Sequence, residues 1–191
     1  MIGYALCGSF CTHAVSVDTL KILKNDFEEI IPIISDAVRT TDTRFGNAAD
    51  LTHTLEEICS RPVIDTIKDA EPLGPKTKLD LLIIAPCTGN TLAKIAHGIT
   101  DTPVTMAAKA HLRSNRPLLI ALATNDALSA NLENIGKLLM RKNVYFVPLV
   151  QDDTVKKPHS LVADFDKIPE CVRAALDDIQ IRPLFLTNPS K

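Results

Sequence analysis

The chain has few aromatic residues and no excess of basic over acidic residues. Its 191 residues include no tryptophan, only 4% aromatic residues and 7 glycines, and the net charge is −2. Because lysines and arginines are interspersed with acidic residues, the charge pattern argues against a nucleic-acid partner. No apolar run approaches the ~18 to 20 residues of a membrane span, and the segment Met1 to Leu6 lacks the basic start of a signal peptide. We therefore expect a cytoplasmic protein with no membrane partner.

Two nucleotide-binding signatures and a metal motif are also missing. The sequence contains neither GxxxxGK[ST], which excludes a P-loop NTPase at the level of motif, nor GxGxxG. The five cysteines are an odd number, and Cys7 and Cys11 have no second cysteine pair or histidine cluster to complete a metal site. We expect free thiols and no bound metal.

Hydrophobic content, in contrast, is high. With 46% hydrophobic residues and no Gly/Ser-rich or Pro-rich linker, the chain can bury one sizeable core. We expect a single domain over residues 1–191, in which 154–191 form a C-terminal tail and helix.

Short apolar runs alternate with segments of helical periodicity. The pattern predicts strands over residues 2–7, 30–34, 79–85, 117–123 and 144–150. Helices are expected over residues 10–24, 48–59, 90–97, 105–113, 127–142 and 169–181, with short helix and loop over 61–78. Fully apolar strands separated by helices favour a mostly parallel sheet covered on both faces, and right-handed crossovers then give a doubly wound, Rossmann-like three-layer α/β fold.

In such a fold, ligands bind outside the carboxyl ends of the strands. Four strand exits carry polar residues: Cys7 to His13, Ile34 to Asp36, Pro86 to Thr91, and Leu122 to Asp126. Hydroxyls, amides and free N–H groups with little positive charge suit a neutral heterocycle carrying one phosphate. This chemistry points to a mononucleotide such as FMN, with an adenine dinucleotide as the competing ligand.

Helix capping is the competing interpretation for several of these residues. Thr88 and Asn90 could simply begin the helix that follows them, and Asp126 could cap the next one. At the second exit, Ser35 could bind phosphate, whereas Asp36 could accept a hydrogen bond from a ribose diol.

The third exit also resembles a known family. Ala85 to Lys94 reads APCTGNTLAK, which is similar to the Ala-Pro-Ala-Thr/Ser-Ala-Asn-Thr-Ile-Ala-Lys pattern of FMN-binding flavoproteins related to cysteine decarboxylases and flavin prenyltransferases. The similarity continues to Asp101. A Gly-Ser pair at the first exit, a serine at the second and an Ala-x-Asn at the fourth follow in the same order, so the resemblance covers roughly residues 1 to 150.

The resemblance implies a flavin site and an oligomer. It places the FMN phosphate on Gly8, Ser9 and Ser35 and the flavin edge near Asn125. The ribityl chain and ring would lie along the third exit, on Pro86, Cys87, Thr88, Asn90 and Thr91. Because such proteins commonly build the flavin pocket between subunits, a trimer or a multiple of trimers is implied.

Departures from the family pattern bear on the reaction. Decarboxylases of this family carry a histidine before the third strand, but Asp69 to Gly74 contains none, and their Ala-Met-Asn is replaced by Ala-Thr-Asn at 123–125. These differences argue against decarboxylation of a cysteinyl peptide. The run from Gly8 to Asp153 is closer to a subunit that acts with a partner A subunit on a small dicarboxylate, which implies an oxidoreductase subunit. FMN, or NADP held by the partner, would then take the electrons. A non-catalytic binding or regulatory subunit and a flavin-dependent decarboxylase remain the alternatives.

No catalytic residue can be named from the sequence. The five histidines are scattered, and Ser9 has no His/Asp pattern around it. A basic cluster before the fourth strand could meet the substrate carboxylates, although a basic helix end exposed to water is the favoured interpretation; its members are Lys109, His111, Arg113 and Arg116.

Overall fold

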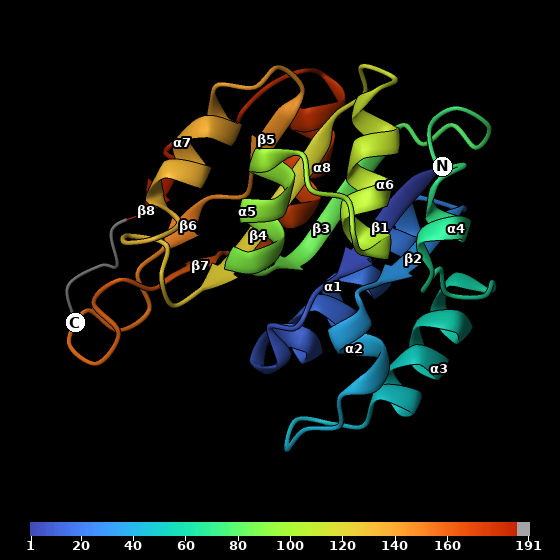
Figure 1. Ribbon diagram of the computed structural model, residues 1–191, viewed down its shortest axis with the longest axis horizontal. Helices are drawn as coiled ribbons and strands as arrows, with labels where there is room; N and C mark the ends of the chain where they lie inside the picture. Colours follow the sequence, from blue (N-terminus) through green and yellow to red (C-terminus); the bar gives the residue numbers. More distant parts are fainter. Residues whose placement is uncertain (187–191) are drawn as a thin grey trace.

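The computed structural model describes residues 1–186, which form an α/β structure around one central sheet (Figure 1). Five parallel strands make up its larger part, in the order β2-β1-β3-β4-β5. Their bounds are β1 Ile2–Leu6, β2 Ile30–Ile34, β3 Leu81–Cys87, β4 Leu118–Thr124 and β5 Val144–Phe146. Every residue of β1, β2 and β3 is buried, which is why these strands read as uninterrupted apolar runs. The expected doubly wound, mostly parallel fold is confirmed.

Helices cover both faces of this sheet. Figure 1 shows α5 (Gly89–His97), α6 (Pro103–Leu112) and α7 (Leu132–Leu139) in front of the strands and α8 (Ile168–Leu176) behind them. Helix α1 (His13–Asp26) contacts α8 and also packs against α3 (Ala48–Cys59), beside the edge strand β2. The shorter elements are η1 (Phe10–Thr12), α2 (Asp36–Thr40), α4 (Ile67–Ala70) and η2 (Phe165–Lys167).

The C-terminal part of the chain adds strands to the sheet. β7 (Leu161–Ala163) runs antiparallel between β4 and β6 (Leu149–Val150), and β8 (Phe185–Leu186) pairs with β6. Residues expected to form a tail from 154 onward therefore contribute two strands and the core-packed helix α8. The last five residues of that predicted tail, 187–191, lie outside the described residues.

Several predicted bounds differ from the structure. The apolar run 144–150 is divided into β5 and β6, with Pro148, which lacks a backbone N–H, between them. The helix expected over 127–142 begins only at Leu132, because the backbone N–H of Leu128 donates instead to His159 O at 2.9 Å. The five-residue helix α2 was not anticipated.

Candidate functional site

The first three strand exits lie side by side at the carboxyl edge of the sheet. The backbone N–H of Cys7 donates to Pro86 O at 3.0 Å, and that of Ser35 donates to Leu6 O at 3.0 Å. These two bonds tie the end of β1 to the ends of β3 and β2. The sequence-predicted residues of the three exits are thereby brought together in space.

At the first exit, a tight turn leads from β1 into η1. A Cβ at Gly8 would lie 3.3 Å from Ala37 Cβ and 3.5 Å from the Phe10 ring, so the turn packs closely against α2. The Ser9 N–H donates to Cys7 O at 2.8 Å, and Ser9 O accepts from Thr12. The Ser9 hydroxyl itself has no partner among residues 1–186, which leaves it available to a ligand.

At the second exit, Ser35 begins helix α2. Its buried hydroxyl accepts from the Val38 N–H at 3.4 Å, and its own O–H remains free to donate to an anion. Asp36 is exposed and pairs with Arg39 at 3.5 Å. Nothing in this arrangement favours the ribose contact considered for Asp36.

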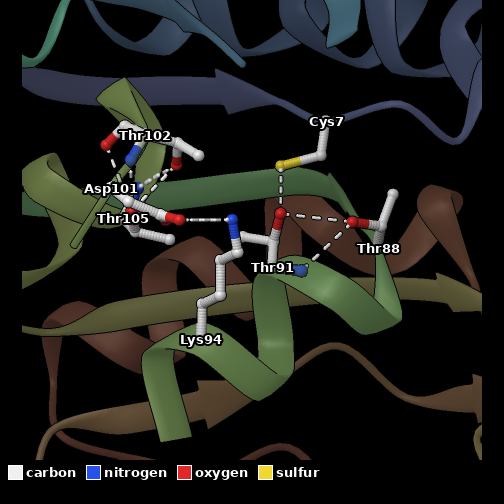
Figure 2. Close-up of polar contacts among 7 residues, drawn as sticks. All are labelled: Cys7, Thr88, Thr91, Lys94, Asp101, Thr102 and Thr105. Atoms are coloured by element: carbon white, nitrogen blue, oxygen red, sulfur yellow. Dashed lines mark hydrogen bonds and ion pairs between the residues drawn. The ribbon is translucent and has the colours of Figure 1, made fainter. Parts of the chain in front are cut away.

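At the third exit, the threonines hold the turn (Figure 2). Thr88 caps helix α5 by accepting from the Thr91 N–H at 3.3 Å, and its hydroxyl donates to Thr91 Oγ1 at 3.2 Å. Thr91 Oγ1 in turn donates to Cys7 Sγ at 3.3 Å, which links α5 to the end of β1. The capping interpretation is therefore confirmed for Thr88, and the principal role of Thr91 in this structure is to join two strand exits.

The two cysteines at this edge are poor nucleophiles. Cys7 and Cys87 are both buried, and burial raises the pKa of the Cys7 thiol to about 11 and that of Cys87 well above its ordinary value. A thiol with a raised pKa is protonated at neutral pH and unreactive. Cys87 can line a ligand but offers no thiolate.

Two asparagines at this edge differ from Thr88 and Thr91, whose hydroxyls are hydrogen-bonded within the protein. Asn90, in the first turn of α5, and Asn125, just after β4, are both exposed. Neither side chain has a hydrogen-bond partner within the described part of the chain. Each presents an amide at the carboxyl edge of the sheet that no described residue uses.

The fourth exit contains a polar network that was not predicted. The Asp126 carboxylate accepts from the Thr124 hydroxyl and, at 2.9 Å, from Asn131 Nδ2; Asn131 Oδ1 accepts from Asn134. This network occupies the space in front of Gly89: a Cβ there would lie 2.5 Å from Asn131 Nδ2 and 2.8 Å from Asp126 Oδ1. The one signal in the sequence is that Gly89 stands where the family pattern has alanine.

The end of the family-like motif is structural. Helix α5 ends at Gly98, whose φ of 72° is left-handed. Lys94 then pairs with Asp101 at 2.9 Å, and Thr102 and Thr105 form a capping box that begins α6 (Figure 2). These residues fix the α5–α6 connection.

The basic cluster considered for substrate carboxylates lies at the wrong edge. Arg116 donates to Leu79 O at 2.9 Å and to the Asp80 carboxylate at 2.7 Å, just before β3 begins. His111 is fully buried, with Nε2 donating to Pro117 O. This cluster is at the amino ends of β3 and β4, opposite the predicted flavin residues, because parallel strands share one carboxyl edge.

Two further basic residues, in the loop between β6 and β7, lie closer to the carboxyl edge than the Arg116 cluster does. Strand β7 pairs antiparallel with the last residues of β4, and His159 O accepts from Leu128, so this loop lies at the carboxyl end of β4. It carries Lys156, which is exposed, and Lys157, which pairs with Asp152 at 3.1 Å. Neither lysine was predicted to belong to the site, because the position of both depends on the antiparallel strand.

The family is shown by comparison with known proteins. The model of the family described as flavoprotein matches residues 5–177. The chain belongs to the flavoprotein family. The B subunit of dipicolinate synthase from Bacillus subtilis is 43% identical to this flavoprotein over 187 residues, covering 98% of this chain and 94% of its relative.

Two solved structures are also similar to this chain. The crystal structure of the dipicolinate synthase B subunit from Bacillus halodurans matches with a TM-score of 0.89 and 40% identity, covering 97% of this flavoprotein and 95% of that chain. The FMN-dependent cysteine decarboxylase SpaF matches with a TM-score of 0.70 at 21% identity, over 93% and 95% of the two chains, which shows a shared fold. The resemblance to FMN-binding flavoproteins stated from the motif is thus confirmed. None of the helices within residues 1–186 is long and apolar enough to cross a membrane.

Proposed function

We propose that this flavoprotein is the B subunit of a dipicolinate synthase, which forms pyridine-2,6-dicarboxylate from a dihydrodipicolinate-type precursor together with a partner A subunit. The observation that carries this proposal is the 43% identity to the Bacillus subtilis relative over nearly the whole length of both chains. We place the reaction in the cytoplasm of the mother cell of a sporulating bacterium.

We assign the cofactor FMN to the carboxyl edge of the sheet. Gly8, Ser9 and Ser35 would hold the phosphate, and the Ser9 hydroxyl, which has no partner within the described chain, supports this assignment. The ribityl chain and ring would extend along 86–91 toward Asn125, where the Asn90 and Asn125 amides are unused. The Asp126 carboxylate beside Gly89 disfavours a phosphate at the start of α5, so the phosphate is directed to the Gly8 end.

The residues of the site match the requirements of the reaction. Aromatising a dihydropyridine removes a hydride equivalent and a proton, and FMN supplies an acceptor for two electrons when bound. NADP on the A subunit is the alternative acceptor. The substrate is a dianion, and we assign its carboxylates to Lys156 and Lys157 in the β6–β7 loop, because the cluster around Arg116 is at the opposite edge. We further propose a homo-oligomer, a trimer or a multiple of trimers, in which a neighbouring copy completes the flavin pocket.

Two alternative functions make different predictions. A non-catalytic binding or regulatory subunit would keep the pocket and show no turnover unless the A subunit is present. A flavin-dependent decarboxylase is disfavoured because the stretch 69–74 lacks the histidine that this chemistry uses in the family. Transfer of a labelled substrate hydrogen to FMN, measured with and without the A subunit, separates the first alternative from our proposal.

The first test is a visible absorption spectrum of the purified chain before and after FMN is added, with binding followed by quenching of flavin fluorescence. Flavin bands or saturable quenching are expected. No binding at high flavin concentration would overturn the FMN assignment and leave the chain as a structural or substrate-binding partner of the A subunit.

A further inference from the structure

A second concave site lies beside the predicted phosphate residues but does not include them. It is a cavity of about 380 Å³ between η1 and α1 on one side and residues 41–54, which include the start of α3, on the other. This volume is at the small end of the range for small-molecule pockets, about 300 to 1,000 Å³. None of the residues assigned to FMN lines it. The apolar part of its wall is formed by Phe10, Ala14, Val17, Val38, Phe45 and Leu51.

The aromatic side chains suit a flat ligand. Phe10 comes from η1, and Phe45 comes from the loop before α3 and is 54% exposed in the chain alone. The Arg44 guanidinium covers one face of the Phe45 ring, 4.8 Å from its centroid, so a ligand would use the other face. Contact with a flat aromatic ring is more favourable for an exposed phenylalanine than contact with water. Thr43, Asn47 and Thr54 also line the cavity and add uncharged polar groups. The Thr43 and Thr54 hydroxyls and Asn47 Nδ2 donate to Gly46 O, Asp50 O and Asp50 Oδ2, which holds this wall in place.

His13 lines the cavity, and its ring carries one hydrogen-bond acceptor that the rest of the described chain does not use. Its ring is only 8% exposed and packs edge-on against Phe10, with the two centroids 5.2 Å apart. Nε2 lies 2.8 Å from Cys7 O, and because a carbonyl oxygen only accepts, Nε2 carries the proton. Nδ1 is then an unprotonated acceptor, without a partner among residues 1–186. Burial lowers the pKa of His13, which keeps the ring neutral at neutral pH.

Charge around the cavity selects against an anionic ring. The charged lining residues are Asp18, Asp50 and Lys21, and the lysine already pairs with Asp18 at 2.9 Å. Among the lining residues, the Asp50 carboxylate therefore has no cationic partner and accepts only from Asn47 Nδ2, while the Arg44 guanidinium lies outside the lining, over the Phe45 ring. A pyridine dicarboxylate would meet repulsion here, whereas a neutral ring with an N–H donor would not.

We propose that this cavity is a second ligand site of the chain, which takes an uncharged heteroaromatic ring bearing an amide or amino N–H, with that N–H donating to His13 Nδ1. The ring chemistry is that of a nicotinamide or an adenine. Binding at this site does not depend on flavin, so it can succeed or fail independently of the proposed function.

The test uses the absence of tryptophan from the chain. Phe45→Trp introduces a single tryptophan at the cavity wall while keeping an aromatic side chain there. Its emission is titrated with nicotinamide, adenosine, nicotinate and pyridine-2,6-dicarboxylate, with no FMN present. Two further substitutions are made in this background: Ala14→Phe, which fills the cavity, and the matched control Ala49→Phe, which alters an exposed alanine of α3 outside it.

We expect saturable quenching by nicotinamide or adenosine, at least tenfold weaker binding of nicotinate and of the dicarboxylate, loss of saturation in Ala14→Phe and no change in Ala49→Phe. Comparison of nicotinamide with adenosine identifies which ring the site prefers. Quenching that rises linearly without saturation, equal binding of the neutral and anionic rings, or unchanged binding in Ala14→Phe would each overturn the proposal. Calorimetric titration of the unsubstituted chain with the same four compounds checks that the introduced tryptophan did not create the site.

Discussion

Gly89 and Asp126 occupy adjoining space at the carboxyl edge of the sheet, since a Cβ on residue 89 would lie 2.8 Å from Asp126 Oδ1. The glycine at the start of α5 and the hydrogen-bonded carboxylate after β4 are therefore one structural unit. The carboxylate, held by Thr124 and Asn131, sits where the first turn of α5 carries positive partial charge. This unit closes one end of the predicted flavin site to a phosphate.

Gly89→Ala should destabilise the chain by about 1 to 3 kcal/mol, because the added methyl group forces the Asp126 network apart. Gly136→Ala is the matched control: it is also a helical glycine, but a Cβ there meets nothing within 4 Å. That change should stabilise the protein by about 0.5 to 1 kcal/mol through helix propensity. Urea unfolding measures both variants. If the two variants have equal free energies of unfolding, the Asp126 network can move to accept the methyl group without a loss of stability.

Asn90→Leu should weaken FMN binding at least about tenfold, because the side chain has an unused amide at the proposed ribityl and ring site and tenfold corresponds to about 1.4 kcal/mol. Asn25→Leu, an exposed position near the end of α1, is the control and should bind normally. Flavin fluorescence titration gives both affinities. Normal flavin affinity in Asn90→Leu would refute the site assignment.

Lys156→Ala should raise the KM for the dicarboxylate substrate of the reconstituted two-subunit enzyme and leave flavin affinity unchanged. The lysine is exposed in the β6–β7 loop, where its charge can meet a carboxylate. Lys109→Ala, on α6, is the control, because α6 leads into the Arg116 cluster at the other edge. A KM effect in Lys109→Ala alone would reverse our assignment of the substrate carboxylates.

One of the five thiols should react rapidly with a thiol reagent in the folded protein. Cys11 is exposed, whereas the other four are buried, and burial raises the pKa of Cys59 to about 11 and that of Cys171 to about 12. Cys11→Ser should abolish the rapid phase, and all remaining thiols should react after denaturation. A rapid phase that survives in Cys11→Ser would mean that at least one of the four buried thiols becomes accessible in solution.

The ion pairs of Asp80 should make the free energy of unfolding fall as the pH is lowered. The N-terminal amine of Met1, at 2.9 Å, and Arg116, at 2.7 Å, hold the pKa of Asp80 below its ordinary value. A lowered folded-state pKa stabilises the protein above the unfolded-state pKa, about 3.9, and this stabilisation is lost as the pH falls through the folded-state value. Asp80→Asn should therefore be less stable at neutral pH, by less than about 1 kcal/mol because the pair is partly exposed. The difference should shrink as the pH falls from about 5 to 3, and a difference that grows would contradict the assigned pairing.

Much of the fold could be predicted because the pattern is local. The runs in β1, β2, β3 and β4 are buried on both faces, so apolar residues alone mark them, and Thr88 and Gly98 mark the two ends of α5 by their capping chemistry. Short elements such as α2 and β7 could not be found in this way. With three to five residues, neither has a periodicity of its own, and each forms because neighbouring elements hold it in place.

Part of the candidate site could likewise be predicted from the sequence, and part could not. Residue order alone located the strand exits, the Gly8-Ser9 turn and the polar residues that follow each strand, because parallel strands deliver their last residues to one edge. Which side chains remain free there depends on the packed structure: Thr88 and Thr91 bond to each other and to Cys7, while Asn90 has no partner among residues 1–186. The same rule for parallel strands places the Arg116 cluster at the opposite edge, because its residues precede the fourth strand instead of following it. The free hydroxyls and amides could not be predicted, because each depends on contacts between segments far apart in the sequence.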